Sequence, residues 1–221
     1  MRKQQKKRQR IFAIVVVAAV AITMIGSSFA MLGSSFLSSS TSSAGGSIQA
    51  QKALVERLSQ SVEKNPSDGA LQLELGNAYY DLAMSTIQTD MAASQPNFKK
   101  ALEAYQVAVK TKRDINLLVD MATSAFYAGE NDLADKTFKE AITEKPTFLN
   151  ARFNYGIFLM NAKQDYSGAI EQWKTALGYN PSGADADRLK SLISTAQTKL
   201  DAQYQEMLNG PNPAKSGQGG K

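Results

Sequence analysis

Two pairs of aspartates are the side chains of this sequence that come closest to a catalytic arrangement. Asp132 and Asp135 lie three positions apart, and Asp185 and Asp187 lie two positions apart. General acid–base chemistry by a carboxyl group needs an apolar cleft that moves its pKa toward neutrality. Both pairs stand instead where a helix is expected to begin, and the helix dipole favours acidic side chains there. The pattern therefore favours solvated helix starts over an active site.

The chain contains neither histidine nor cysteine. Serine–histidine and cysteine–histidine catalysis are therefore excluded, and so are metal sites built on imidazole or thiolate ligands. The aspartates do not have the spacing of a calcium loop, and the scattered glycines form no phosphate-binding loop. We expect a protein that is not an enzyme and that holds no metal or other cofactor.

Trp173, the single tryptophan, is the residue best suited to stack on a ligand, yet it belongs to a repeated pattern. Four segments share a small or apolar first residue, a ring or leucine at the fifth place, and alanine or serine at the eighth. Three of the four end on proline at the thirteenth place. These segments are residues 54–66, 101–113, 134–146 and 169–181. A ring that returns at one place of a repeat indicates core packing, so we expect Trp173 to be buried.

The elements that carry this pattern are helices. Between residues 48 and 208 apolar side chains recur at three- and four-residue spacing, which predicts helices throughout and no strand. A second apolar stripe and a short turn precede the repeated segments, so the unit is a pair of antiparallel helices that proline closes. Such a unit resembles the tetratricopeptide repeat. The residues that carry the resemblance are Leu75, Gly76, Tyr79, Ala101, Tyr105 and Ala108, then Met121, Ala122, Ala125, Ala134, Phe138, Ala141 and Pro146, then Tyr155, Gly156, Leu159, Ala169, Trp173, Ala176 and Pro181.

The resemblance implies an all-α fold, with a short α-solenoid of about three repeats and flanking helices in residues 48–208. Residues 54–66 look like a lone second helix ahead of the first complete pair. After Pro181 a longer amphipathic stretch is expected to be a cap helix with a solvated outer face. Its apolar face carries Leu189, Leu192, Ile193, Ala196, Leu200 and Tyr204.

The first repeat departs from the pattern in two ways. Gly76 and Ala101 are 25 residues apart, where the corresponding separations in the other units are 12 and 13. The additional residues, near 85–97, either extend the first helix or form a loop. Arg113 also stands where the other units have the closing proline.

The N-terminus predicts a membrane anchor. A basic tail, residues 1–10, holds six lysines and arginines, and residues 11–32 contain no charge. That is long enough for a transmembrane helix, and the basic tail should stay on the cytoplasmic side. We expect a single-pass signal anchor in the cytoplasmic membrane of a bacterial-type cell, with the rest of the chain outside. A cleavable signal peptide is the alternative and would make the protein secreted.

The remaining terminal segments and the charge balance are less informative. The Ser/Gly-rich residues 33–47 predict a flexible linker, and residues 209–221 predict a disordered tail. Beyond residue 10 the chain carries 19 basic and 20 acidic side chains. This near-neutral balance gives no indication of a nucleic-acid partner.

The resemblance further implies a concave groove lined by the first helices of the repeats. The residues expected to face it are mostly apolar or aromatic, and none is lysine or arginine, which argues against a clamp for a peptide's C-terminal carboxylate. Either the cap helix or the additional residues near 85–97 cover this groove, or it binds an apolar helix or an extended peptide. The candidate partner-binding residues are Leu73, Asn77, Tyr80, Val119, Thr123, Phe126, Tyr127, Phe153, Ile157 and Met160.

The function that these patterns favour is that of a membrane-anchored scaffold. It would bind a partner protein or peptide at the extracytoplasmic face during assembly of an envelope complex. Bacterial membrane proteins with this repeat, including assembly factors for c-type cytochromes, act in that way. The alternative is a structural subunit that uses the groove to self-associate.

Overall fold

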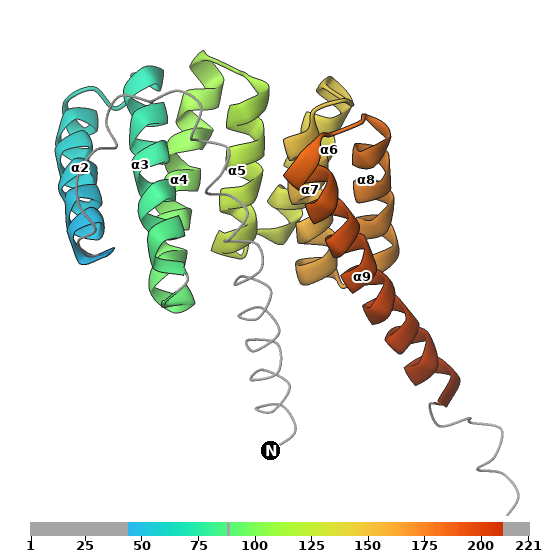
Figure 1. The fold of residues 1–221 in the computed structure, drawn as a ribbon. Helices are drawn as coiled ribbons and strands as arrows, with labels where there is room; N and C mark the ends of the chain where they lie inside the picture. Colours follow the sequence, from blue (N-terminus) through green and yellow to red (C-terminus); the bar gives the residue numbers. More distant parts are fainter. Residues whose placement is uncertain (1–43, 88, 210–221) are drawn as a thin grey trace, which may run out of the picture. The chain divides into compact units, whose positions relative to one another are not determined.

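Every regular element in the described part of the chain is helical, which confirms the predicted all-α class. A computed structural model describes residues 44–87 and 89–209 (Figure 1). The predicted basic tail, the predicted membrane span and most of the linker and C-terminal tail lie outside these residues. The elements are α2 (Ala44–Lys64), α3 (Gly69–Ile87), α4 (Met91–Thr111), α5 (Ile115–Ala128), α6 (Asn131–Glu144), α7 (Leu149–Phe158), the π-helix η1 (Leu159–Lys163), α8 (Tyr166–Gly178) and α9 (Gly183–Asn209).

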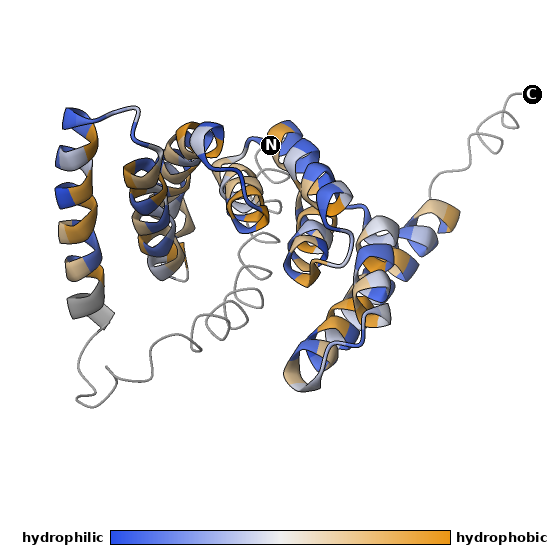
Figure 2. Cartoon of the chain, turned by 90° about the horizontal axis from the view of Figure 1, so that it is seen from above, coloured by the Kyte–Doolittle hydropathy of each residue, from blue (hydrophilic) through white to orange (hydrophobic). Residues whose placement is uncertain are grey.

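The helices fall into two compact units that divide between Pro146 and Thr147. The first unit contains α2 to α6 and the second contains α7, η1, α8 and α9. Within each unit, the main packing partner of a helix is the helix next to it in sequence. Figure 2 shows the hydrophobic side of α2 turned toward α3 and its hydrophilic side turned away. Among the described helices, none combines the length and the apolar character that crossing a membrane requires.

Short polar side chains define where several helices begin. Asp90, Asp114 and Asp165 each precede a helix and accept hydrogen bonds from its first free backbone N–H groups. This capping satisfies donors that have no partner within the helix. Gly129 ends α5 in the left-handed conformation at φ 89°, which glycine adopts without steric cost. Asp114 and Gly129 therefore set the start and the end of α5.

A small residue on the first helix of each pair faces a ring on the second helix. A Cβ atom on Gly76 would lie 2.6 Å from ring atoms of Tyr105, and one on Gly156 would collide with the indole of Trp173. The second pair has Ala122 and Phe138 at these places, both fully buried. Trp173 is also fully buried, so its predicted place in the core is confirmed.

The additional residues of the first repeat lengthen both of its helices. α3 continues to Ile87 and α4 begins at Met91, so most of residues 85–97 are helical. Within this range, Ile87 forms an apolar core cluster with Ala83 and Phe98, and Met91 packs against it. A loop, one of the two predicted alternatives, is therefore not what the described residues form.

α9 is longer than the helix on which it packs. Leu189, Leu192 and Ala196 are buried, whereas every residue from 201 to 209 is exposed. α8 has 13 residues and α9 has 27. The final turns of α9 therefore extend beyond the end of α8 that begins at Tyr166.

Candidate interaction surface

The candidate groove residues lie on helices of both units. Those of the first unit are on α3 and α5, and those of the second are on α7 and η1. Leu73, Tyr80, Phe126, Tyr127 and Phe153 are half-buried, and Asn77 is exposed. The others are almost fully covered, with exposed fractions of 3% for Val119, 4% for Thr123, 5% for Ile157 and 3% for Met160.

In the first unit, three of the half-buried rings join one aromatic cluster. Phe98 stacks on Tyr127 with ring centroids 4.6 Å apart, and it meets the edge of Tyr80 at 5.7 Å. Phe126 lies 4.6 Å from Tyr127 in a tilted arrangement. These contacts hold the rings in position, and part of each half-buried ring stays accessible to another molecule.

The lengthened α3–α4 pair contributes directly to this cluster. Ile87 and Phe98 belong to the same apolar core to which Tyr80 and Tyr127 pack. The Gln95 side-chain amide also donates a 3.2 Å hydrogen bond to the backbone carbonyl of Ala128, at the end of α5. The lengthened α3–α4 pair therefore packs against two candidate groove residues, Tyr80 and Tyr127. The other repeats have no counterpart of this packing.

One polar group of the Asn77 side chain is already hydrogen-bonded to a neighbouring helix. The hydroxyl of Tyr105 on α4 donates a 2.9 Å hydrogen bond to Asn77 Oδ1. Tyr105 is 1% exposed, so this bond satisfies a hydroxyl that would otherwise be buried without a partner. The amide group of Asn77 keeps its two N–H donors for another contact.

Two acidic residues, Asp120 and Asp81, lie near this cluster, and Asp120 was not identified from the sequence. Burial is the main cause that raises the pKa of Asp120 to about 7, and the charges of Asp114 and Asp81 add to it. Burial also raises the pKa of Asp81. Burial, together with these two carboxylates, raises the pKa of Tyr80. No repeat position or spacing marks Asp120, because its pKa depends on side chains that only the fold brings near it.

In the second unit, Phe153 belongs to the contact between α7 and α8. The indole N–H of Trp173 donates a 3.1 Å hydrogen bond to the backbone carbonyl of Phe153. The neighbouring Arg152 donates to the side-chain oxygen of Gln172 at 2.8 Å and lies 5.8 Å from the ring of Tyr179. Ile157 and Met160 are buried, so Phe153 supplies most of the exposed surface among the candidates of this unit.

The aspartate pairs do not form an acid–base site. Asp132 and Asp185 are in the first turns of α6 and α9. Asp135 pairs with Lys139 at 3.0 Å, and Asp187 with Lys190 at 3.6 Å, each within its own helix. Residues 44–87 and 89–209 contain no group of three or more acidic side chains that could hold a metal ion.

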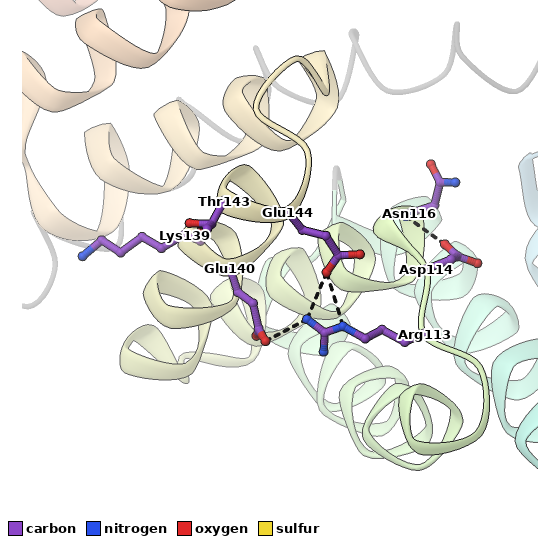
Figure 3. A network of polar contacts seen from close by, with 7 residues as sticks. All are labelled: Arg113, Asp114, Asn116, Lys139, Glu140, Thr143 and Glu144. Atoms are coloured by element: carbon purple, nitrogen blue, oxygen red, sulfur yellow. Dashed lines mark hydrogen bonds and ion pairs between the residues drawn. The ribbon is translucent and has the colours of Figure 1, made fainter.

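Arg113, which replaces the closing proline of the first repeat, pairs with two glutamates at once (Figure 3). Its guanidinium contacts Glu140 at 2.7 Å and Glu144 at 3.1 Å, both on α6. The hydrogen bonds that Arg113 donates to Glu140 and Glu144 raise its pKa. All three side chains are exposed, so this network positions the loop after α4 and forms no enclosed site.

Comparison with known proteins agrees with this two-helix arrangement. Residues 119–173 match the family model described as Tetratricopeptide repeat. A solved structure described as "Crystal structure of MamA" is similar over 76% of this chain and 99% of that chain, with 12% identity and a TM-score of 0.50. Another, described as "MamA AMB-1 P212121", covers 75% of this chain and 97% of that chain at 20% identity and a TM-score of 0.38. At 12% identity, the similarity to the first of these structures shows a shared fold and nothing more. No curated protein matches the sequence.

Proposed function

Because the chain is a tetratricopeptide-repeat protein, we propose that it is a non-enzymatic scaffold that binds a partner protein through the first helices of its repeats. The observation that carries this proposal is the aromatic cluster of the first unit. Tyr80, Phe126 and Tyr127 remain half-buried on α3 and α5; Phe98 contacts Tyr80 and Tyr127, and Tyr127 contacts Phe126. Rings that are fixed in place and partly exposed are typical anchors for a partner.

The chemistry of the partner follows from the same residues. Leu73 and the three rings offer apolar contact, and the N–H donors of Asn77 offer a single polar contact. The candidate positions contain no lysine or arginine. We therefore expect an apolar helix or extended peptide, whose binding depends little on salt.

We further propose that this scaffold is anchored in the cytoplasmic membrane by residues 11–32 and works at the extracytoplasmic face. The uncharged segment and the basic residues before it support this proposal. Assembly of an envelope complex, as for c-type cytochromes, is the process that fits such a location. That part rests on the resemblance to other anchored proteins of this repeat type.

Partner capture tests the proposal. Crosslinking in intact membranes followed by purification of the full-length chain should recover a partner protein. We expect Tyr127→Ala and Phe153→Ala each to weaken capture by about 1–2 kcal/mol, because partly exposed rings act as anchors. Capture should be similar at low and high salt.

A matched control separates binding from folding. Tyr179→Ala removes an exposed ring outside the candidate positions and should leave capture unchanged. The melting temperature of every variant is needed, because Tyr127 also stacks on Phe98. Unchanged capture by both groove variants would exclude the groove, and loss of capture at high salt would indicate a polar surface instead.

Self-association through the same surface is the alternative function. The two functions predict different captured proteins, because self-association would recover only a second copy of this chain. Mixing two differently tagged full-length chains distinguishes these outcomes. Recovery of the second tag alone, abolished by Tyr127→Ala, would favour the structural subunit.

A further inference from the structure

The end of α9 exposes apolar side chains that no other described element covers. Tyr204, Met207 and Leu208 have exposed fractions of 51%, 69% and 76%. They follow one another at spacings of three and one, so they lie on one side of the helix. Exposed apolar groups that gather on one face are a mark of an interaction site.

Met207 continues the seam through which α9 packs on α8, and Tyr204 and Leu208 lie beside it. Along α9 the seam positions recur at alternating spacings of four and three, the pattern of helices that pair along their length. The early members Leu189 and Ala196 are buried at 3% and 0% exposure. The seam runs on after α8 has ended, so its last turns have no helix to pack on. Its positions are Leu189, Ile193, Ala196, Leu200, Gln203 and Met207.

A shallow cleft marks the place where α8 stops. It has a volume of about 540 Å³ and is bordered by Gln164 to Ser167 on one side and by Leu200 to Met207 on the other. Tyr166, the first residue of α8, lines it together with Tyr204. Because the start of α8 lies beside the last turns of α9, the two helices run antiparallel. An incoming helix could therefore take up the line of α8 beyond its first residue.

The exposed part of the seam is complementary to itself. When two copies of α9 run antiparallel about a two-fold axis at Gln203, Leu200 of one copy lies beside Met207 of the other. The two Gln203 side chains then meet, and a polar residue in an otherwise apolar seam fixes the register of a helix pair. The two segments 200–209 overlap over residues 200–206, which is about 10 Å at 1.5 Å per residue.

The charges beside the seam agree with this pairing. Lys199 and Glu206 are seven residues apart and therefore lie on the same flank of α9. In the antiparallel pair, Lys199 of each copy comes next to Glu206 of the other, so the attraction occurs twice. The C-terminal end of one α9 also approaches the N-terminal end of α8 of the other copy, which aligns their helix dipoles favourably.

We propose that the protruding end of α9, residues 200–209, is a homodimerisation surface that pairs antiparallel with α9 of a second copy. The tip of each helix, with Met207 and Leu208, occupies the cleft beside Tyr166 of the other copy. This surface lies outside the candidate groove, so its test is independent of the proposed scaffold function. The exposed apolar area is small, so the pairing is weak unless the copies share one membrane.

Cysteine crosslinking in the full-length chain tests this geometry without background, because the chain has no cysteine of its own. Gln203→Cys places two thiols at the two-fold axis, within reach of a disulfide. Oxidation should convert most of this variant to a covalent dimer. Ala202→Cys is the matched control, since Ala202 is exposed and is turned about 100° around α9 from Gln203, away from the seam. It should give at least tenfold less dimer.

A charge exchange provides the second test. Lys199→Glu puts like charges beside each other at both symmetry-related contacts and should reduce the crosslinking of Gln203→Cys several-fold. Adding Glu206→Lys restores opposite charges and should restore crosslinking. A purely structural role of either residue would not produce this rescue.

Two results would overturn the proposal. Equal crosslinking at Gln203 and Ala202 would mean that the ends of α9 meet only by random collision. Crosslinking of Gln203→Cys to another protein, with no homodimer, would assign the surface to a different partner. If the groove proves not to bind a partner but Gln203→Cys still crosslinks, the proposed α9 dimer stands while the proposed scaffold function fails.

Discussion

At the scale of single residues, Gly156 and Trp173 show how closely the helix pairs approach. A methyl group on Gly156 would overlap the indole, whereas one on Gly178 would meet no atom within 4 Å. We expect Gly156→Ala to lower the free energy of unfolding by about 1–3 kcal/mol, because the ring cannot move without losing its place in the core.

Urea denaturation of the full-length chain measures this effect, and Gly178→Ala is its control. The control should leave stability unchanged or raise it, because alanine restricts the unfolded chain more than glycine does. Equal stabilities of the two variants would mean that Trp173 can shift away from α7 freely.

Asp120 should make stability depend on pH. Its pKa is about 7 in the folded chain and about 4 in an unfolded one. Between these values the folded state keeps a proton that the unfolded state releases. The free energy of unfolding therefore falls as pH rises from about 4 to 7, and it levels off above that. Asp81, whose pKa is also raised, acts in the same direction.

Melting curves at pH 5 and pH 8 check this expectation. Asp120→Asn removes the titrating group and should show a smaller loss of melting temperature between the two values than the native chain. Asp187→Asn, at an exposed position of α9, should behave like the native chain. An identical pH dependence of Asp120→Asn and the native protein would contradict the raised pKa.

At the scale of elements, the α5–α6 pair depends on small residues where the two helices meet. Ala134 and Ala141 have no exposed surface. We expect Ala141→Leu to cost about 1–3 kcal/mol of stability, because the larger side chain must push the helices apart. Ala93→Leu, at an exposed position of α4, is the control and should have little effect. Chemical denaturation that finds Ala141→Leu as stable as the native chain would show that α6 faces α5 with another side.

The helix pairs could be predicted from the sequence because their signal is local and repeated. Small residues and rings return at fixed places, and Gly76 with Tyr105 and Gly156 with Trp173 meet as the spacing indicates. The shape of residues 85–97 could not be predicted, because they have no counterpart in the other repeats. Their apolar side chains suit a helix or a covered loop equally well.

The candidate site was harder to predict than the helices. Periodicity places residues such as Val119 and Ile157 on the first helices, but it does not say how closely neighbouring side chains cover them. It also gives no information on Tyr80 and Tyr127 packing against the lengthened pair. Asp120 carries no motif at all, since its raised pKa comes mainly from burial in the fold and only partly from the charges of Asp114 and Asp81. Whether the groove binds a partner remains a prediction.

At the scale of the whole molecule, the predicted topology can be tested directly. Residues 11–32 and the basic tail before them predict that the repeats lie outside the cytoplasmic membrane. Protease added to intact cells should therefore digest the chain beyond Gly33. Complete protection of the repeats, with digestion only after the cells are opened, would contradict this orientation. Recovery of a chain that begins at Met31 would contradict only the anchor.

The packing of each helix on its sequence neighbours affects how the chain can acquire its structure. Contacts between helices join mainly consecutive helices within each unit. A pair such as α3 and α4 can thus form as soon as both helices have emerged, without waiting for the remainder of the chain. A polypeptide that passes in extended form through a narrow export channel could then fold progressively on the far side, and its early pairs would resist sliding back.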